Sequence, residues 1–161
     1  MSTQVTVDLT TMKKERQMLS PSEAEARGIH ARHECMENGE WRFRLMARDG
    51  SGYIRTETGT AGAWQNSHWH NVVRETYIVQ VGWIALVEQH AAGLTWTLLR
   101  PSDIHTTEPH VQHNVYMSAH SVVHTIKHGP IDGAEDWTPA PELDAATKCI
   151  TEEEILKRCQ R

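Results

Sequence analysis

Two histidines and a glutamate stand close together at the start of an apolar segment. The stretch "SHWHNVVRETYIVQV" places His68 and His70 two residues apart, with Glu75 five residues further on. In a β-strand, residues i and i+2 point to the same face, so both imidazoles would lie on one side. Two imidazoles and a carboxylate are a common ligand set for divalent Fe, Mn, Ni, Zn or Co. We therefore predict that these three residues bind one divalent transition metal.

Two glycines frame this group of ligands. Gly62 comes before His68 and Gly82 comes after Glu75, so the segment reads G-x5-H-x-H-x4-E-x6-G. This spacing resembles the first sequence motif of the cupin superfamily, and every position of that motif is matched. The resemblance implies an all-β fold, the double-stranded β-helix or jelly-roll barrel of the cupins. It also implies a metal held by this motif together with one histidine of a second motif.

The second cupin motif, G-x5-P-x-G-x2-H-x3-N, has a degenerate counterpart in "SDIHTTEPHVQHNVYM". His113 falls on the position of the ligand histidine. The other motif positions differ, with Ser102 and His110 at the two glycine positions, Glu108 at the proline and Met117 at the asparagine. The resemblance therefore completes the predicted metal site with His113, and it leaves the turn geometry of the second motif open. It covers residues 41–128.

Tyr77 and His124 are the candidates for proton transfer. Tyr77 shares a strand face with Glu75, so its phenol could serve as a general acid or bind substrate, although a packing role explains it equally well. His124 alternates with Val122 and Ile126. If that face lines the barrel, His124 contacts substrate, and otherwise it is a hydrogen-bonded core or rim residue. We predict both residues as catalytic, with these structural roles as the alternatives.

Three classes of function are open for a metal-binding cupin, because this scaffold supports many reactions. The first is a redox-neutral isomerase, epimerase or lyase for a sugar or keto acid, whose carbonyl the metal would polarise. The second is an Fe(II)- or Ni-dependent dioxygenase, which an apolar pocket lined by tryptophan would favour. The third is a non-enzymatic cupin that binds a small ligand. We favour the redox-neutral enzyme, and the resemblance implies a homodimer.

The segments around the predicted site have the period-two pattern of β-strands. Trp41, Phe43 and Leu45 alternate with Arg42 and Arg44, which is typical of a half-buried strand. Similar segments recur about every 8–12 residues between turn residues, which indicates an antiparallel sandwich or barrel. The expected strands cover 41–48, 53–58, 75–82, 83–89, 94–100, 104–108, 114–119 and 121–128.

The two ends of the chain have a different character. Near the start, Ser20 is a helix N-cap followed by Pro21, and Gly28 ends the short helix. Near the end, a proline-rich segment is expected to run over the surface before a helix capped by Thr151 and Glu154. We predict an N-terminal arm and helix over 1–40, the barrel over 41–128 and a C-terminal extension over 129–161.

Composition excludes several classes of protein. A net charge of −5 argues against a nucleic-acid-binding surface, and no apolar run approaches the ~20 residues of a membrane span. The N-terminus lacks the apolar segment of a signal peptide, and three cysteines without CxxC spacing are expected to be free thiols. We therefore expect a cytoplasmic protein with a small-molecule partner. Among the 11 histidines, His105 and His110 could also line its pocket.

Overall fold

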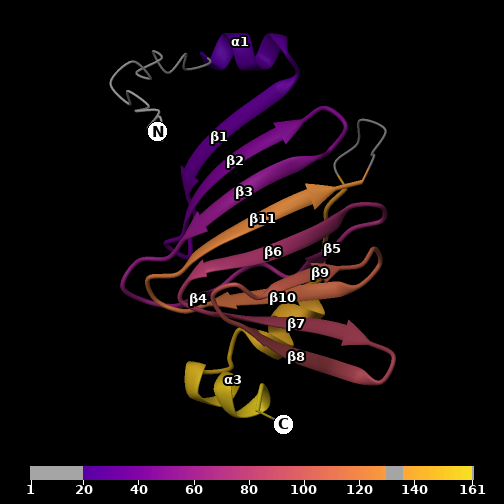
Figure 1. Ribbon diagram of the computed structural model, residues 1–161. Helices are drawn as coiled ribbons and strands as arrows, with labels where there is room; N and C mark the ends of the chain where they lie inside the picture. The colour runs from indigo at the N-terminus through magenta and orange to yellow at the C-terminus, as the bar shows by residue number, and fades with distance from the viewer. Residues whose placement is uncertain (1–19, 130–135, 161) are drawn as a thin grey trace, which may run out of the picture.

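Two antiparallel β-sheets pack face to face in the computed structural model of the chain, which describes residues 20–129 and 136–160 (Figure 1). The first sheet has the order β1 (Ile29–Cys35), β2 (Trp41–Ala47), β3 (Gly52–Glu57), β11 (Val122–His128), β6 (Arg74–Val81) and β9 (Ile104–Thr107). The second has the order β12 (Thr138–Pro139), β5 (His68–Trp69), β10 (Gln112–Met117), β7 (Ile84–His90) and β8 (Gly93–Leu99). A short strand, β4 (Ala63–Trp64), also pairs with β10. This arrangement confirms the predicted all-β jelly-roll barrel.

All eight strands expected from the period-two pattern form, and the N-terminal region adds one more. Residues 29–35, which were expected within the arm, form β1 and pair in register with β2. The reason is the open edge of β2, whose backbone N–H and C=O groups would otherwise lack a partner strand. The remainder of the expected arm, residues 1–19, lies outside the described residues.

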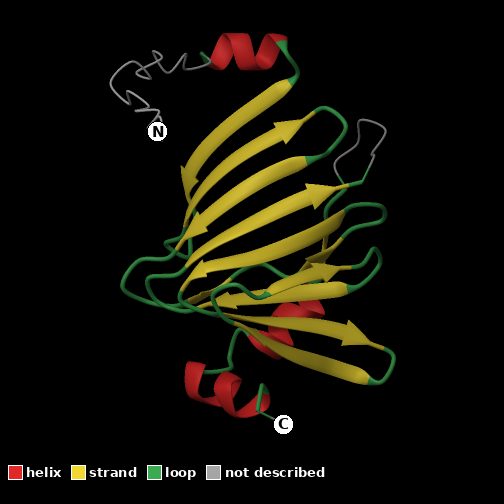
Figure 2. Ribbon diagram, in the orientation of Figure 1, coloured by secondary structure: helices red, strands yellow, loops and turns green. Residues whose placement is uncertain are grey.

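Three short helices flank the barrel (Figure 2). α1 (Pro21–Ala26) and α3 (Glu152–Arg158) begin at the predicted caps, Ser20 and Thr151, each in a complete capping box. α2 (Pro141–Thr147) was not expected, because its proline-rich start resembles a surface segment, yet proline is well suited to the first position of a helix. No helix within the described ranges is long and apolar enough to cross a membrane.

The C-terminal helices cover the outer face of the second sheet. Ile155 of α3 is completely buried against Ala85 and Tyr116, and Leu143 of α2 packs on Val87. Burial of such side chains stabilises by about 1.5–3 kcal/mol each. The C-terminal extension therefore stabilises the second sheet, to which β5 and β10 belong.

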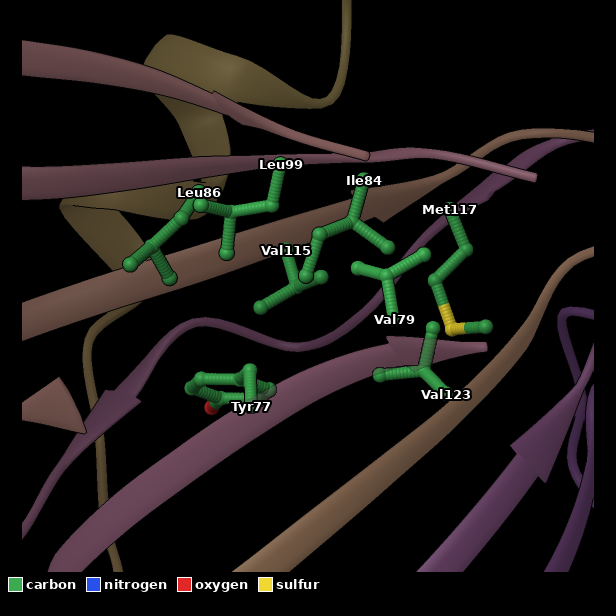
Figure 3. Close-up of a cluster of buried hydrophobic side chains, with 8 residues drawn as sticks. All are labelled: Tyr77, Val79, Ile84, Leu86, Leu99, Val115, Met117 and Val123. Atoms are coloured by element: carbon green, nitrogen blue, oxygen red, sulfur yellow. The ribbon is translucent and has the colours of Figure 1, made fainter. Parts of the chain in front are cut away.

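The barrel interior is arranged in layers along the strands. At one end, the apolar side chains Val79, Val123, Ile84 and Met117 meet between the two sheets, and Tyr77 lies beside them (Figure 3). Four residues further along these strands the inward side chains are polar or charged, because period two keeps alternate residues on the same face. The register pairs Glu75 with Lys127 across β6 and β11 and His113 with Glu88 across β10 and β7. The apolar layers thus support a polar layer above them.

The orientation of β2 is opposite to the expected one. Trp41, Phe43 and Leu45 face outward with exposed fractions of 56%, 48% and 44%. Arg42 and Arg44 are partly buried and face the barrel interior, where they line a cavity. The pattern did predict the strand, but the rule that the apolar face is buried fails here because the interior at this end is polar.

Candidate metal centre

Four side chains from three strands converge at the polar end of the barrel. His68 lies on β5, His70 follows it directly, Glu75 lies on β6 and His113 on β10. All four are buried, and one potential ligand atom from each lies within 4.8 Å of the others. The Nε2 atoms of His70, His113 and His68 are 3.2, 3.3 and 3.4 Å from the carboxylate oxygens of Glu75. The structure therefore brings together all four residues predicted as metal ligands.

Strand pairing explains why residues far apart in sequence meet here. β5 pairs with β10 so that His68 stands directly opposite His113. Glu75 belongs to the facing sheet, where it is the first inward residue of β6. The turn between His70 and Glu75 lets one short segment supply ligands from both sheets.

The hydrogen bonds of the three imidazoles fix their tautomers. In each ring, Nδ1 contacts a backbone carbonyl oxygen: Asn66 for His68, Asp136 for His70 and Val111 for His113. Since a carbonyl oxygen only accepts hydrogen bonds, each Nδ1 carries the proton in the neutral ring. Each Nε2 therefore presents a lone pair toward Glu75. Such backbone anchoring is typical of metal-ligating histidines.

This donor set fits a divalent cation. Three lone pairs and a carboxylate directed at one point repel one another unless a positive charge lies between them. His68 Nε2 is buried and has no hydrogen-bond partner among the described residues, as expected for an atom whose partner is a metal. Burial lowers the pKa of His68, against the opposing effect of Glu75, so its ring stays neutral. Neutral imidazoles and an ionised carboxylate are the forms that bind metals.

Two further side chains contact the Glu75 carboxylate. Lys127 Nζ is 2.8 Å from Glu75 Oε1, and the Tyr77 hydroxyl donates to Oε2 at 2.5 Å. Burial opposes ionisation of Glu75, but the neighbouring Lys127 ammonium outweighs it and holds the pKa of Glu75 well below the ordinary range. Burial and the neighbouring carboxylate raise the pKa of Tyr77 well above its ordinary value. Tyr77 is thus a phenol that donates a hydrogen bond at neutral pH.

The two glycines of the first motif have steric roles. Gly82 has φ of +75°, and a Cβ atom there would meet the hydroxyl of Ser121. A Cβ atom at Gly62 would collide with the Tyr116 ring and hydroxyl. Only glycine fits both positions without movement of a neighbour.

The second motif keeps its turn geometry although its glycines are replaced. Ser102 and His110 have φ of 79° and 64°, in the left-handed region that glycine usually occupies. The His110 N–H donates to the carbonyl oxygen of His70 at 2.7 Å, and its ring lies 5.9 Å from the Trp69 ring. The turn therefore delivers His113 to the cluster despite the residue changes, and His110 has a structural position.

The structure does not bring His124 to the cluster. Its imidazole bonds the Tyr53 hydroxyl and the Gln80 side chain, both at 2.8 Å, on the outer face of the first sheet. The face of β11 that lines the interior carries Thr125 and Lys127 instead. His124 therefore has the hydrogen-bonded position that was the alternative to a catalytic role, and the sequence left both open because Val122 and Val123 make either phase of the strand equally apolar.

His105 lies near the cluster but outside the cavity. Its Nε2 atom is 3.3 Å from Glu88 Oε2, and His90 Nε2 is 3.8 Å from the same oxygen. Glu88 is buried, with only 8% exposure, although its place near a hairpin end suits a solvated residue.

A cavity of about 640 Å³ opens in front of the four-residue cluster. His68, Glu75 and Tyr77 form part of its wall, and the inner faces of β1, β2 and β3 form much of the rest. Trp137 also lines it and stacks on His68 with ring centroids 5.5 Å apart. The cavity is large enough for a small organic molecule.

Sequence reasoning missed Asp136, which supports the site from outside. Its carboxylate accepts hydrogen bonds from the backbone N–H groups of Asn71, Val72 and Val73, while its carbonyl oxygen accepts from His70. Although burial opposes ionisation, these N–H groups lower the pKa of Asp136 to about 2. Asp136 thereby fixes the turn between His70 and Glu75. No spacing rule links it to His70, because it follows that residue by more than sixty residues.

Comparison with known proteins relates the chain to others through its fold. No family model matches the sequence, and no curated protein matches it. Oxalate decarboxylase from Bacillus subtilis superposes with a TM-score of 0.54 and 14% identity, over 82% of this chain and 37% of that enzyme's length. KdgF from Halomonas sp. superposes with a TM-score of 0.52 and 17% identity, over 63% of this chain and 88% of that protein. Both neighbours are cupins, and this chain has the cupin fold that its first motif predicts.

Proposed function

We propose that the chain is a metal-dependent enzyme that isomerises, epimerises or eliminates from a small polar molecule such as a sugar or keto acid. The observation that carries this proposal is the cluster of His68, His70, Glu75 and His113 at the wall of a polar cavity. These four residues would hold one divalent transition metal. A bound metal would supply Lewis-acid polarisation of a substrate carbonyl or hydroxyl oxygen.

Tyr77 is the residue of this chain that we assign to proton handling. Tyr77 lines the cavity, and its hydroxyl donates to Glu75. Its raised pKa keeps it protonated, so it can donate a hydrogen bond to a substrate oxygen. The surrounding protein excludes water from Tyr77, which is only 3% exposed, and so strengthens such a hydrogen bond.

The polarity of the cavity favours the redox-neutral reaction over a dioxygenase. A dioxygenase pocket was expected to be apolar and rich in tryptophan, but Trp137 is the one tryptophan among the described lining residues. Most of the lining residues are polar or charged: His30, Arg32, Glu34, Arg42, Arg44, Arg48, Thr56, Gln65, Asn66 and Thr125 join the cluster residues there. Such a wall suits a substrate with several hydroxyl or carbonyl groups.

The proposed partner is a small molecule, and the proposed location is cytoplasmic. The net charge of −5 supports a small-molecule partner rather than nucleic acid. Cys35, Cys149 and Cys159 are all free thiols, which supports a reducing compartment.

Elemental analysis of the purified protein tests the proposal. We expect close to one metal ion per chain in the wild type, and loss of most of it in His68→Ala. His124→Ala is the matched control, because it removes a histidine from the other face of the same barrel and should retain the metal.

The identity of the metal directs the next measurement. Zinc, manganese or cobalt supports the redox-neutral enzyme, which is then screened with sugars and keto acids by NMR for isomer formation. Iron or nickel together with oxygen uptake supports a dioxygenase instead. Wild-type protein that binds no metal, even after reconstitution, contradicts the proposal and leaves a ligand-binding cupin as the better account.

A further inference from the structure

Lys127 occupies an unusual place for a lysine. It lies on the inner face of β11, directly across from Glu75 on β6, and its side chain is only 14% exposed. Its Nζ atom is 2.8 Å from Glu75 Oε1 and 3.5 Å from His70 Nε2. Among the described residues, Glu75 is the one carboxylate that Lys127 contacts.

Metal binding at the cluster would leave Lys127 without a counterion. The four-residue cluster contains a single negative charge, that of Glu75. A divalent metal bound to Glu75 carries two positive charges against this single negative charge. The ammonium of Lys127 adds another positive charge next to it. Buried positive charge is costly unless it is paired. The occupied site therefore requires an anion close to both the metal and Lys127.

The wall of the cavity also carries an excess of positively charged side chains. Five cationic side chains line it against three carboxylates, those of Glu34, Glu75 and Asp136, while Glu40 behind the wall pairs with Arg42. Glu34 is shared between Arg32 and Arg44, so that one carboxylate serves two guanidinium groups. Asp136 already accepts hydrogen bonds from three backbone N–H groups. A cavity lined in this way attracts anions from solution.

We propose that the ligand of this cavity carries an oxyanion, a carboxylate or a phosphate, and that Lys127 binds this group beside the metal. The inference rests on the metal centre of the proposed function and names the class of its substrate. Lys127 exchanges its ion pair with Glu75 for one with the ligand, because the metal takes over Glu75. The anionic group is thereby oriented toward Tyr77 and the metal ligands.

The arginines give the rest of such a ligand a second polar contact. Lys127 on β11 and Arg44 on β2 lie on strands that are two apart, roughly 10 Å across the sheet, and Arg44 is offset by two residues along it. Both side chains are directed into the cavity. The space between them suits a molecule of about six carbons with polar groups along its length.

Calorimetric titration of the metal-loaded protein with matched pairs of probes tests this inference. D-Gluconate and D-sorbitol differ only in a carboxylate at C1, and D-glucose 6-phosphate and D-glucose differ only in the phosphate. We expect at least one anion of these two pairs to bind at least tenfold more tightly than its neutral counterpart. The pair that shows the preference identifies the oxyanion as carboxylate or phosphate.

Two lysine variants locate the anion contact. Lys127→Met should bind the preferred anion at least tenfold more weakly than the wild type does, while the neutral probe binds as in the wild type. Its metal stoichiometry should be unchanged, since the lysine is not a ligand. Lys157→Met on α3 is the matched control, because that lysine pairs with Glu153 on the exposed surface, and it should bind both probes normally. A thermal melt of each variant confirms that it is folded.

The outcomes separate the two proposals. If the wild type takes up metal but binds gluconate no better than sorbitol, and glucose 6-phosphate no better than glucose, the anion proposal is wrong and the metal centre stands. An unchanged anion affinity in folded, metal-loaded Lys127→Met also overturns it. If the wild type binds no metal, Lys127 keeps Glu75 as its partner, and the anion proposal falls together with the metal centre.

Discussion

Tyr77 joins the four-residue cluster to the apolar core. Its ring packs among core side chains such as Val79 and Val115, and its hydroxyl reaches back to Glu75 Oε2. The hydrogen bond restrains the carboxylate in the rotamer that faces the three imidazoles. Partners of this kind, which hold a metal ligand in place, change metal affinity when they are removed.

We therefore predict that Tyr77→Phe weakens metal binding by about tenfold while one metal per chain is still bound. The ring remains to fill the core, so the fold is retained, and only the hold on Glu75 is lost. A chelator-competition titration measures the affinity. Tyr53→Phe is the control, because its hydroxyl bonds His124 on the outer face and should leave the affinity unchanged. Equal affinities in wild type and Tyr77→Phe would contradict the assigned role.

At the residue scale, sequence patterns located the ligands better than their surroundings. His68, His70 and Glu75 follow from local spacing, and His113 from the resemblance to the second cupin motif, so neither step needed a three-dimensional contact. Lys127 was missed because its place depends on the pairing of β11 with β6, which puts it opposite Glu75. A lone lysine in a strand usually faces solvent, and nothing within β11 itself marks this one as buried.

At the scale of elements, the turns of the second motif hold stored strain. Ser102 and His110 adopt positive φ, which costs a residue with a Cβ atom about 1–2 kcal/mol. The Ser102 N–H donates to the Val79 carbonyl at 3.2 Å, and the ladder on either side holds the turn in place. The surrounding strands thus impose the geometry that glycine would adopt freely.

Ser102→Gly should accordingly stabilise the fold by about 0.5–1 kcal/mol, once the greater chain entropy of unfolded glycine is subtracted from the relieved strain. Ser102 is exposed, so no packing is lost. The reverse change, Gly82→Ala, should destabilise by more than 1 kcal/mol because φ is +75° and Ser121 blocks the Cβ atom. Urea unfolding measures both variants, and a Ser102→Gly variant less stable than wild type would show that the turn is not strained.

Elements were predictable where a single period dominates the sequence. Period two identified the strands and the capping boxes identified α1 and α3, since both signals are local. The inward face of β2 was not predictable, because burial of Arg42 and Arg44 depends on the cavity and on the buried partner Glu40. α2 was missed because its stability comes from Leu143 packing on the second sheet, a contact that proline-rich sequence does not reveal.

At the scale of the whole molecule, the first sheet has an unusual distribution of polarity. Its inner face carries charges around the cavity, whereas its outer face exposes Trp41, Phe43 and Leu45 side by side on β2. Period two makes these two properties inseparable, because every arginine turned inward turns an apolar neighbour outward. A cationic cavity and an apolar outer surface are therefore consequences of one sequence pattern.

This outer surface supports the homodimer that the cupin resemblance implies. Three large apolar side chains at roughly half exposure are more stable when a second copy covers them. Light scattering after size exclusion should give twice the mass of the chain for the wild type. Phe43→Glu, which places a charge at the centre of the surface, should give the mass of one chain while it keeps the metal. Ile104→Glu is the control, because Ile104 is 63% exposed on β9, at the opposite edge of the same sheet. A wild-type monomer, or a dimer that survives Phe43→Glu, would exclude this face as the contact.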